Sequence, residues 1–243
     1  MTEKMQTYLG KWTIEELDRL LRNSSLIRDV SERIGFLSKQ FLDVAYQKST
    51  LAGDAHTLEI LVLNLAGVDC FTLIDYVEAM RLSGSFSEFI ENLKRVRYRI
   101  GKVAFETRNH FFTDWVEYNA GTIEDATNVI GGSQTVTIRK RLNLRRDGTP
   151  FVQGIPPKER EIHYIPVNAL DEMILGRMKT GDYAGVYSDD DGLDVSHVGI
   201  IIRTEDGIFL RHASSLSTHR MVLDEEFRGY IAKGTGLVVL RPK

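Results

Sequence analysis

Cysteine is almost absent from this chain: its 243 residues contain one, Cys70. A single cysteine excludes an intrachain disulfide framework and any metal site built from several thiolates. It does not fix the compartment, because an exported protein can also lack disulfides. Cys70 is therefore either a small buried hydrophobic side chain or a reactive thiol. Most of the functional interpretation depends on which of these is correct.

The chain also lacks an excess of charge of one sign and any long apolar run. Lys and Arg number 31 and Asp and Glu 34, a net charge of −3, so no global field attracts nucleic acid or an anionic membrane. The longest apolar run, residues 58–68, is about half of the ~20 residues that cross a bilayer. Residues 1–12 show no apolar signal-peptide core, as would also be true of a processed chain. We expect no nucleic-acid partner, no transmembrane segment and no obligate protein partner.

The first hundred residues read mainly as helices. Thr13 followed by Glu16 is a capping-box pattern, and Ser85 followed by Glu88 repeats it. Residues 30–46 place apolar side chains at helical spacing and predict one further helix. The apolar segment 57–67 fits a buried helix or a short extended run, and its periodicity does not decide between them: TLEILVLNLAG.

After about Gly101 the pattern changes to short β-branched segments separated by Gly, Asp or Pro. One late helix is expected at residues 223–234. Helices followed by strands indicate an α+β domain with an antiparallel sheet. We expect a single domain over residues 1–243, with a mainly helical annex at 1–60 and a catalytic core at 61–243. The predicted strands lie in residues 134–144, 161–167, 181–188, 194–204, 207–214 and 236–242.

Cys70 lies directly after Asp69, at the expected start of a helix whose apolar stripe includes Leu73 and Val77. The thiol is in phase with this stripe, which favours a core position. The first turn of a helix also offers free backbone N–H groups and a positive dipole end, which favour a nucleophilic thiolate. Asp69 can cap the helix, but its charge opposes a neighbouring thiolate. A reactive Cys70 therefore needs a basic partner.

His197 is the first candidate partner among the six histidines. It alternates with Val195, Gly199 and Ile201 on the expected face of a strand. A histidine within a core strand is more often hydrogen-bonded and structural than catalytic. Gly199 on the same face indicates that another group approaches closely there.

His212 shares a face with Ile208 and Leu210 on the next predicted strand. The best turn dipeptide between the two strands is Asp206-Gly207, which predicts a longer or bulged connection. If His197 and His212 meet, one imidazole can take the thiol proton while the other orients it. Their pairing is not established by the sequence.

The segment RNHFFTDW, residues 108–115, carries a second group of candidates. Arg108, His110 and Asp114 can contact carboxylate, hydroxyl and amide groups, and Trp115 can stack on a sugar face. The alternative is a structural loop, with Phe111 and Phe112 in the core. Asp194 and Ser196, beside the strand of His197, are candidates to border a cleft. The acidic run 188–194 is expected to be a solvated loop, and the basic run 139–148 an exposed strand and hairpin.

These motifs, in this order, resemble the NlpC-type cell-wall cysteine peptidases, which have a papain-like fold. VDCFTLIDYVEAM at residues 68–80, RNHFFTDW, IHYIP around Tyr164 and GLDVSHVGIII point to one branch of that superfamily. This branch is the N-acetylmuramoyl-L-alanine amidase-like family. The likeness runs from about Ala66 to the C-terminus. It implies an antiparallel sheet packed against the nucleophile helix, with extra N-terminal helices.

The resemblance implies that Cys70 is the nucleophile, His197 the general base and acid, and His212 the residue that orients His197. The substrate would be a peptidoglycan-derived muropeptide, cut between N-acetylmuramic acid and L-alanine in a periplasmic or otherwise exported location. Substrate contacts would come from the candidates named above and from Tyr164. In wider relatives, the aspartate at the position of Asp69 holds a free peptide amine, and a small serine follows the cysteine. In this chain Phe71 stands in place of that serine. This change disfavours recognition of a free L-alanine terminus.

Two alternatives remain open at this stage. The chain could be an endopeptidase that cuts between D-glutamate and the diamino acid of the stem peptide, or a non-catalytic domain that binds muropeptides. No zinc motif or phosphate-binding loop is present in the sequence. We therefore expect no cofactor and no metal, and an amidase activity that is metal-independent.

Overall fold

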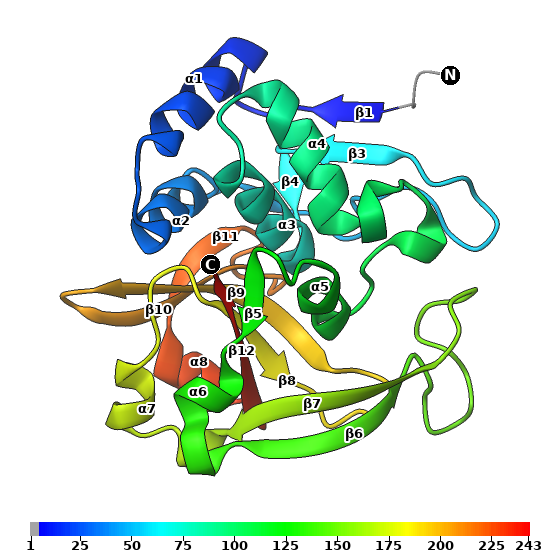
Figure 1. The fold of residues 1–243 in the computed structure, drawn as a ribbon, viewed down its shortest axis with the longest axis vertical. Helices are drawn as coiled ribbons and strands as arrows, with labels where there is room; N and C mark the ends of the chain where they lie inside the picture. The colour runs from blue at the N-terminus through cyan, green and yellow to red at the C-terminus, as the bar shows by residue number, and fades with distance from the viewer. Residues whose placement is uncertain (1–4) are drawn as a thin grey trace. The chain divides into compact units, whose positions relative to one another are not determined.

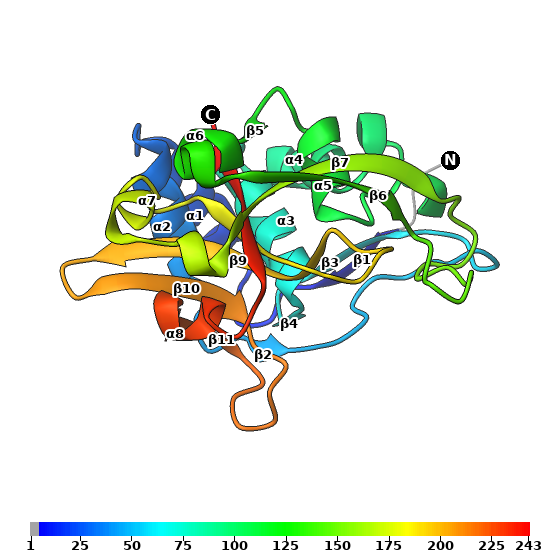
Figure 2. The same ribbon diagram turned by 90° about the horizontal axis from the view of Figure 1, so that it is seen from below.

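The computed structural model describes residues 5–243. The first four residues of segment 1–12, in which no signal-peptide core was found, lie outside the described residues. The chain forms two compact units, which Figures 1 and 2 show from two sides. The first unit contains the residues up to Arg108 together with Arg211–Asp224, and the second contains Asn109–Leu210 and Glu225–Lys243. The expected single catalytic domain over the whole chain stays a prediction.

The first unit is built on α1 (Ile14–Ser25), α2 (Val30–Lys39), α3 (Cys70–Arg81) and α4 (Phe86–Arg97). The predicted caps are present. Thr13 Oγ1 accepts from the Glu16 N–H at 3.2 Å, and the Glu16 carboxylate accepts from the Thr13 N–H at 2.9 Å. Ser85 accepts from the Glu88 N–H at 3.2 Å, but the Glu88 carboxylate accepts from the Gly84 N–H at 2.8 Å, so this second capping box is only half formed. Local sequence therefore sets where these helices begin.

The helix expected over residues 30–46 is wrong in its last part. It ends at Lys39, Asp43 adopts a left-handed φ of 65°, and residues Ala45–Tyr46 form the short strand β2. The backbone of this segment is bonded to distant residues instead: the Asp43 N–H donates to Val222 O at 2.9 Å. Long-range pairing thus replaces the helical hydrogen bonds that local periodicity favoured.

The ambiguous apolar segment contains a strand, β3 (Leu61–Asn64), which is entirely buried. It pairs in parallel with β1 (Met5–Tyr8), so that Tyr8 lies opposite Asn64. After it, β4 (Gly67–Val68) pairs in parallel with β2 and leads directly into α3. Two short 3₁₀ turns, Arg99–Gly101 and Phe105–Thr107, complete this part of the chain.

The second unit contains a large antiparallel sheet, as expected for an α+β protein. Its strand order is β9 (Val195–Thr204), β8 (Tyr183–Tyr187), β12 (Gly236–Pro242), β7 (Lys158–Pro166) and β6 (Val136–Leu142), with β5 (Ile123–Asp125) also paired to β12. β10 (Gly207–Ala213) follows β9 after a two-residue turn, so the connection is not longer as one of the two expected forms required, and the bulged form stays a prediction.

Short helices cover the sheet: α5 (Phe112–Tyr118), α6 (Thr127–Gly131), α7 (Glu172–Gly176) and α8 (Phe227–Ile231). The late helix expected at residues 223–234 is wrong in its first part, because residues Val222–Glu226 form β11. Glu226 then caps α8 by accepting from the N–H groups of Arg228 and Gly229. The apolar core of this unit joins sheet and helices through Ile130, Ile165, Leu175, Ala184, Ile201, Phe227, Ile231 and Val239, among others.

Within residues 5–243, no helix is both long and apolar enough to cross a bilayer.

Candidate functional site

Cys70 occupies the first position of α3, and Asp69 is its N-cap. The Asp69 carboxylate accepts from the Thr72 N–H at 2.8 Å, and Thr72 Oγ1 accepts from the Asp69 N–H at 3.0 Å. From Thr72 to Arg81 the helix is buried, whereas Cys70 is partly exposed. The thiol therefore lies at the open, electropositive end of a helix that is otherwise packed in the interior.

Tyr46 is a neighbour of this thiol that the sequence did not reveal. It pairs with Val68, two residues before Cys70, through β2 and β4. Burial raises the pKa of Tyr46, the charges of Cys70 and Asp69 raise it further, and Arg220 opposes them. The Arg220 guanidinium lies 5.4 Å from the centre of the Tyr46 ring. The phenol therefore stays protonated beside Cys70 and can donate a hydrogen bond.

Replacing Asp69 with asparagine should make Cys70 more reactive. Asparagine caps a helix about as well as aspartate, but it removes the negative charge beside the thiolate. We expect the Asp69→Asn protein to be alkylated by iodoacetamide roughly 2- to 5-fold faster at neutral pH, for a Coulomb term of about 1 kcal/mol. Asp69→Ala, which loses the cap as well, serves as the comparison. An unchanged or slower rate in Asp69→Asn would contradict this electrostatic account.

His197 lies on β9 and is partly exposed. It pairs with Val186, but Tyr187 pairs with Val195, so the strand has a bulge at Ser196. A Cβ added to Gly185 would lie 2.7 Å from Val195 and 2.8 Å from Phe112, which places Val195 on the α5 side of the sheet. The expectation that Val195 shares a face with His197 is therefore wrong, because the extra residue reverses the alternation.

The imidazole of His197 lies at the edge of the core of the second unit. Its ring centre is 5.9 Å from that of Tyr230, and Val186 and Tyr230 pack against the core from its rim. Ile201, four residues further along β9, is fully buried in that core. His197 therefore lies near the exposed end of a strand whose later residues are buried. A catalytic base also needs to be partly accessible.

His212 belongs to the first unit and is 2% exposed. Its neighbour Arg211 is fixed by Asp224 at 2.7 Å and by Ser38 Oγ at 2.9 Å. The Ser214 N–H donates to Met221 O at 2.9 Å, which holds the end of β10. The strand that carries His212 is therefore firmly anchored. Whether His197 and His212 lie opposite each other stays a prediction.

Arg108 is committed to an internal ion pair. It bonds the buried Glu59, with Nε 3.1 Å from Glu59 Oε1, and donates to the carbonyls of Ala52 and Gly53 at 3.0 and 3.2 Å. Its side chain is 14% exposed. Arg108 therefore positions residues 52–53 and has little guanidinium surface left for a substrate. His110, two residues later, is partly exposed.

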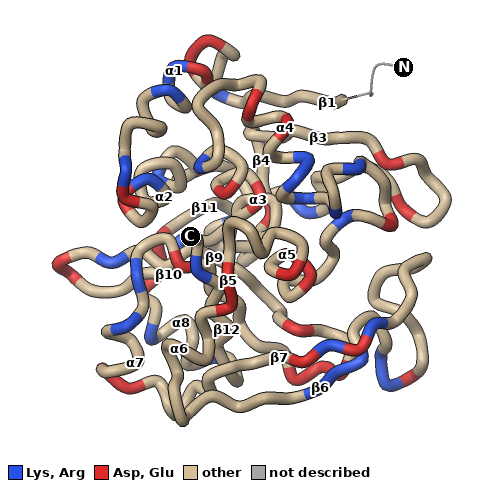
Figure 3. The backbone as a smooth tube through the Cα atoms, viewed as in Figure 1, with Lys and Arg blue, Asp and Glu red and all other residues tan. Residues whose placement is uncertain are grey.

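The candidates on α5 are also engaged. Trp115 is fully buried, stacks on Phe112 and meets the Tyr183 ring edge-on at 4.9 Å, so it has no face open to a sugar. Asp114 pairs with Arg160 and with Lys158 at 3.3 Å. Figure 3 shows basic residues on β6 and alternating basic and acidic residues on the neighbouring strand β7. Phe111 and Phe112 are buried, as predicted.

Asp194 is 2% exposed and ties two distant segments together. Its carboxylate accepts from the Thr113 N–H at 2.7 Å, from Thr113 Oγ1 at 2.9 Å and from the Val195 N–H at 2.8 Å. Burial raises the pKa of Asp194, and these donors oppose that shift. The side chain thus caps α5 from the start of β9. Ser196 beside it is exposed.

Tyr164 stacks on Tyr187, with ring centres 3.9 Å apart. Burial raises the pKa of Tyr187 to about 12, with Tyr164, Asp189 and Asp191 adding to the shift. Lys140 lies 4.4 Å from the Tyr187 ring. Its ammonium also donates to Asp190 O at 3.0 Å and Leu193 O at 3.1 Å, and to Ser188 O. Asp189, Asp190 and Asp191 are exposed, as expected of a solvated loop, while backbone carbonyls of the same run converge on Lys140.

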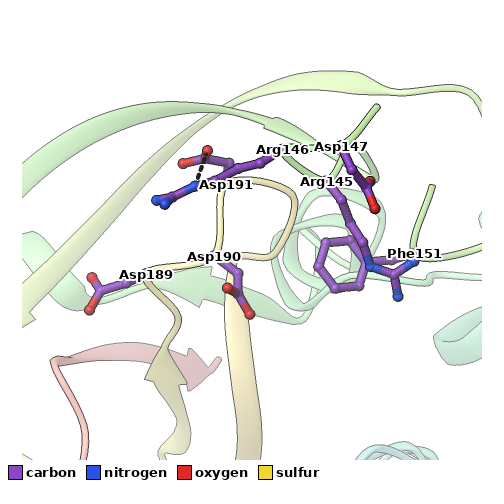
Figure 4. A pocket seen from close by; sticks show the side chains of 7 residues that line it. All are labelled: Arg145, Arg146, Asp147, Phe151, Asp189, Asp190 and Asp191. Carbon is purple, nitrogen blue, oxygen red and sulfur yellow. Dashed lines mark hydrogen bonds and ion pairs between the residues drawn. The ribbon is translucent and has the colours of Figure 1, made fainter. Parts of the chain in front are cut away.

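A cavity of about 450 Å³ lies beside this loop (Figure 4). Arg146 pairs with Asp191 at 2.9 Å, and the Arg145 guanidinium lies 4.1 Å from the Phe151 ring centre. Both arginines of this cavity are therefore paired or stacked within the protein. Within residues 5–243, no group of three or more His, Cys, Asp or Glu side chains is arranged to hold a metal ion.

Comparisons with known proteins extend these observations. No curated protein matches the chain. An N-acetylmuramoyl-L-alanine amidase structure from Bacteroides uniformis is 30% identical, with 88% of this chain and 99% of that chain covered and a TM-score of 0.72. A Bacteroides fragilis structure provisionally named a xylanase is 28% identical, with 84% and 98% covered and a TM-score of 0.67.

A Legionella pneumophila protein structure shares the fold, with a TM-score of 0.79 and 94% of each chain covered, at 21% identity. The family model described as AmiA-like, N-acetylmuramoyl-L-alanine amidase-like, matches residues 36–237. This match includes the Cys70 helix end and both candidate histidines. The chain belongs to the N-acetylmuramoyl-L-alanine amidase-like family.

Proposed function

We propose that the protein is a papain-like cysteine amidase of the NlpC-type superfamily, which hydrolyses the amide between N-acetylmuramic acid and L-alanine in peptidoglycan fragments. The observation that carries the proposal is the partly exposed Cys70 at the capped N-terminus of α3, in a chain of the amidase-like family. A thiol in that position has the electrostatic environment of a nucleophile. The substrate would reach the protein in the periplasm or after export.

In the proposed reaction, the Cys70 thiolate attacks the lactyl carbonyl of the muramic acid. Backbone N–H groups of the first turn of α3 stabilise the resulting oxyanion. The intermediate collapses with cleavage of the C–N bond, His197 gives its proton to the amine of L-alanine, and the sugar remains as a thioester. Water, deprotonated by His197, then releases the acid and restores the thiol. His212 orients His197.

Product analysis tests the bond that is cut. We expect mass spectrometry of digested muropeptides to show the sugar with a free lactyl carboxylate and the intact stem peptide with a free amine. A disaccharide-dipeptide product would instead support the endopeptidase that cuts after D-glutamate. Saturable binding without any product would support a non-catalytic domain, and release of reducing sugar from xylan would support a glycosidase.

Removing metal ions should leave the rate unchanged. The proposed nucleophile is a thiolate and the proposed acid and base are histidines, so no step requires a Lewis acid. We expect equal rates of muropeptide hydrolysis before and after dialysis against EDTA, with a zinc-dependent amidase as the sensitive control. A loss of activity that added zinc restores would contradict the proposed mechanism.

A further inference from the structure

The first unit contains an uncharged polar cavity of about 430 Å³, lined by residues of β1, β3 and the segment 47–52 and by Ala66. Its volume falls within the range of small-molecule sites, about 300–1,000 Å³. The side chains lining it include no Lys, Arg, Asp, Glu or His. Its polar groups are the amides of Gln6, Gln47 and Asn64 and the hydroxyls of Tyr8, Ser49 and Thr50.

Thr50 lines this cavity and carries an unsatisfied hydroxyl. The residue is 8% exposed, yet its Oγ1 has no hydrogen-bond partner among the side chains and backbone of residues 5–243. An unsatisfied buried hydroxyl is costly and therefore uncommon in native proteins. A ligand hydroxyl or amide in the cavity would satisfy it.

Two of the lining amides, those of Gln47 and Asn64, are held in place. Asn64 donates to Gln47 Oε1 at 3.1 Å and accepts from the N–H groups of Ala66 and Gly67. A Cβ on Gly67 would lie 2.6 Å from Gln47 Oε1, so glycine is required for Gln47 to pack there. Tyr8 is 52% exposed and offers an aromatic face. The wall is thus preorganised for neutral hydrogen-bonding groups.

A backbone hydrogen bond within the same unit connects the lining of the cavity to the residues just before Cys70. The Gln47 N–H donates to Val68 O at 2.9 Å, and Val68 precedes Asp69 and Cys70. Arg108 fixes the far end of the lining segment by bonding the carbonyls of Ala52 and Gly53. Gly53 has a φ of 104°, and a Cβ there would lie 2.6 Å from Glu59 Cα.

We propose that this cavity binds the N-acetylated hexosamine of the substrate. A hexosamine presents several hydroxyls and an amide, carries no charge on its ring, and has an apolar face that stacks on tyrosine. This inference rests on the proposed function, in which the sugar stays attached to Cys70 as the acyl group. The sugar must then lie within reach of Cys70, whereas the peptide departs.

Binding to the Cys70→Ala protein tests the site without any turnover. We expect saturation-transfer NMR to detect N-acetylglucosamine, with the dissociation constant raised roughly 3- to 10-fold by Gln47→Ala and by Thr50→Val, as for the loss of one hydrogen bond. Arg145→Ala, in the charged cavity of the second unit, is the matched control and should change nothing. Binding of L-alanyl-D-glutamate that is lost in the same two variants would overturn the assignment in favour of a peptide.

Thermal unfolding separates a ligand-binding hydroxyl from a structural one. Thr50→Val removes an unsatisfied polar atom at nearly constant shape, so the Tm of the free protein should stay level or rise while sugar affinity falls. A lower Tm would show that the hydroxyl has a structural partner and would remove the basis of the proposal. Sugar binding unaffected by either variant would also overturn it, even if Cys70-dependent hydrolysis is confirmed. Failure of hydrolysis with sugar binding intact would refute only the proposed reaction.

Discussion

The Cys70→Ser protein should lose hydrolysis of muropeptides by a factor on the order of 10⁴ or more, as expected when the nucleophile of a catalytic triad is removed. A serine hydroxyl at the same helix end is not ionised by an imidazole to the extent that a thiol is. The measurement is the initial rate of release of L-alanyl peptides at neutral pH. Stoichiometric iodoacetamide should inactivate the unmodified protein equally, because Cys70 is its only cysteine.

A matched control for this substitution is Ser25→Ala, in the last turn of α1. Ser25 is exposed, and its hydroxyl donates within its own helix, to Arg22 O at 2.7 Å, so its loss should affect the rate little. Equal circular dichroism spectra of Cys70→Ser and the unmodified protein exclude unfolding as the cause of inactivity. Retention of full activity after complete alkylation would refute a thiolate nucleophile.

The largest effect on stability is expected from the buried ion pair between α3 and α4. Arg97 Nε lies 2.7 Å from Asp75 Oδ2, with side chains 1% and 2% exposed, and Arg97 also donates to Val62 O at 2.7 Å. Burial alone lowers the pKa of Arg97, but Tyr76, Asp75 and Tyr98 raise it overall, so it stays charged. Arg97→Met should reduce the free energy of unfolding by about 3–5 kcal/mol, because Asp75 is left buried without its partner.

Urea unfolding of three further proteins checks this explanation. The double variant Asp75→Leu, Arg97→Met should recover much of the loss, since neither charge then remains buried. Lys94→Ala removes a partly exposed pair on the same helix, Lys94 with Glu91 at 3.0 Å, and should cost less than about 1 kcal/mol. Asp75→Asn should resemble Arg97→Met in direction. If Arg97→Met lowers the free energy of unfolding by less than about 1 kcal/mol, water reaches the pair and the explanation by burial is wrong.

Local sequence was sufficient wherever neighbours along the chain decide the structure. The caps at Thr13, Asp69 and Ser85 involve residues three positions apart, and all three are present. The strands of the second unit also follow from their β-branched composition. The position of Cys70 at a helix start could therefore be predicted from the segment around Asp69.

The environment of the candidate residues could not be predicted in the same way, because it depends on distant partners. Asp194 bonds Thr113, which is 81 residues away, and Arg108 bonds Glu59, which is 49 away. Both are polar side chains that the sequence suggested for substrate contact, and both are occupied within the protein. The bulge at Ser196 likewise depends on how β8 and β9 align, which alternation within one strand does not reveal.

Lys140 makes the loop before His197 independent of divalent ions. Backbone carbonyls that converge on a cation commonly do so around calcium, whose departure lets the loop relax. Here the positive centre is tethered to β6 by its own side chain. Depletion of divalent ions should therefore leave the loop that precedes β9 in the same conformation.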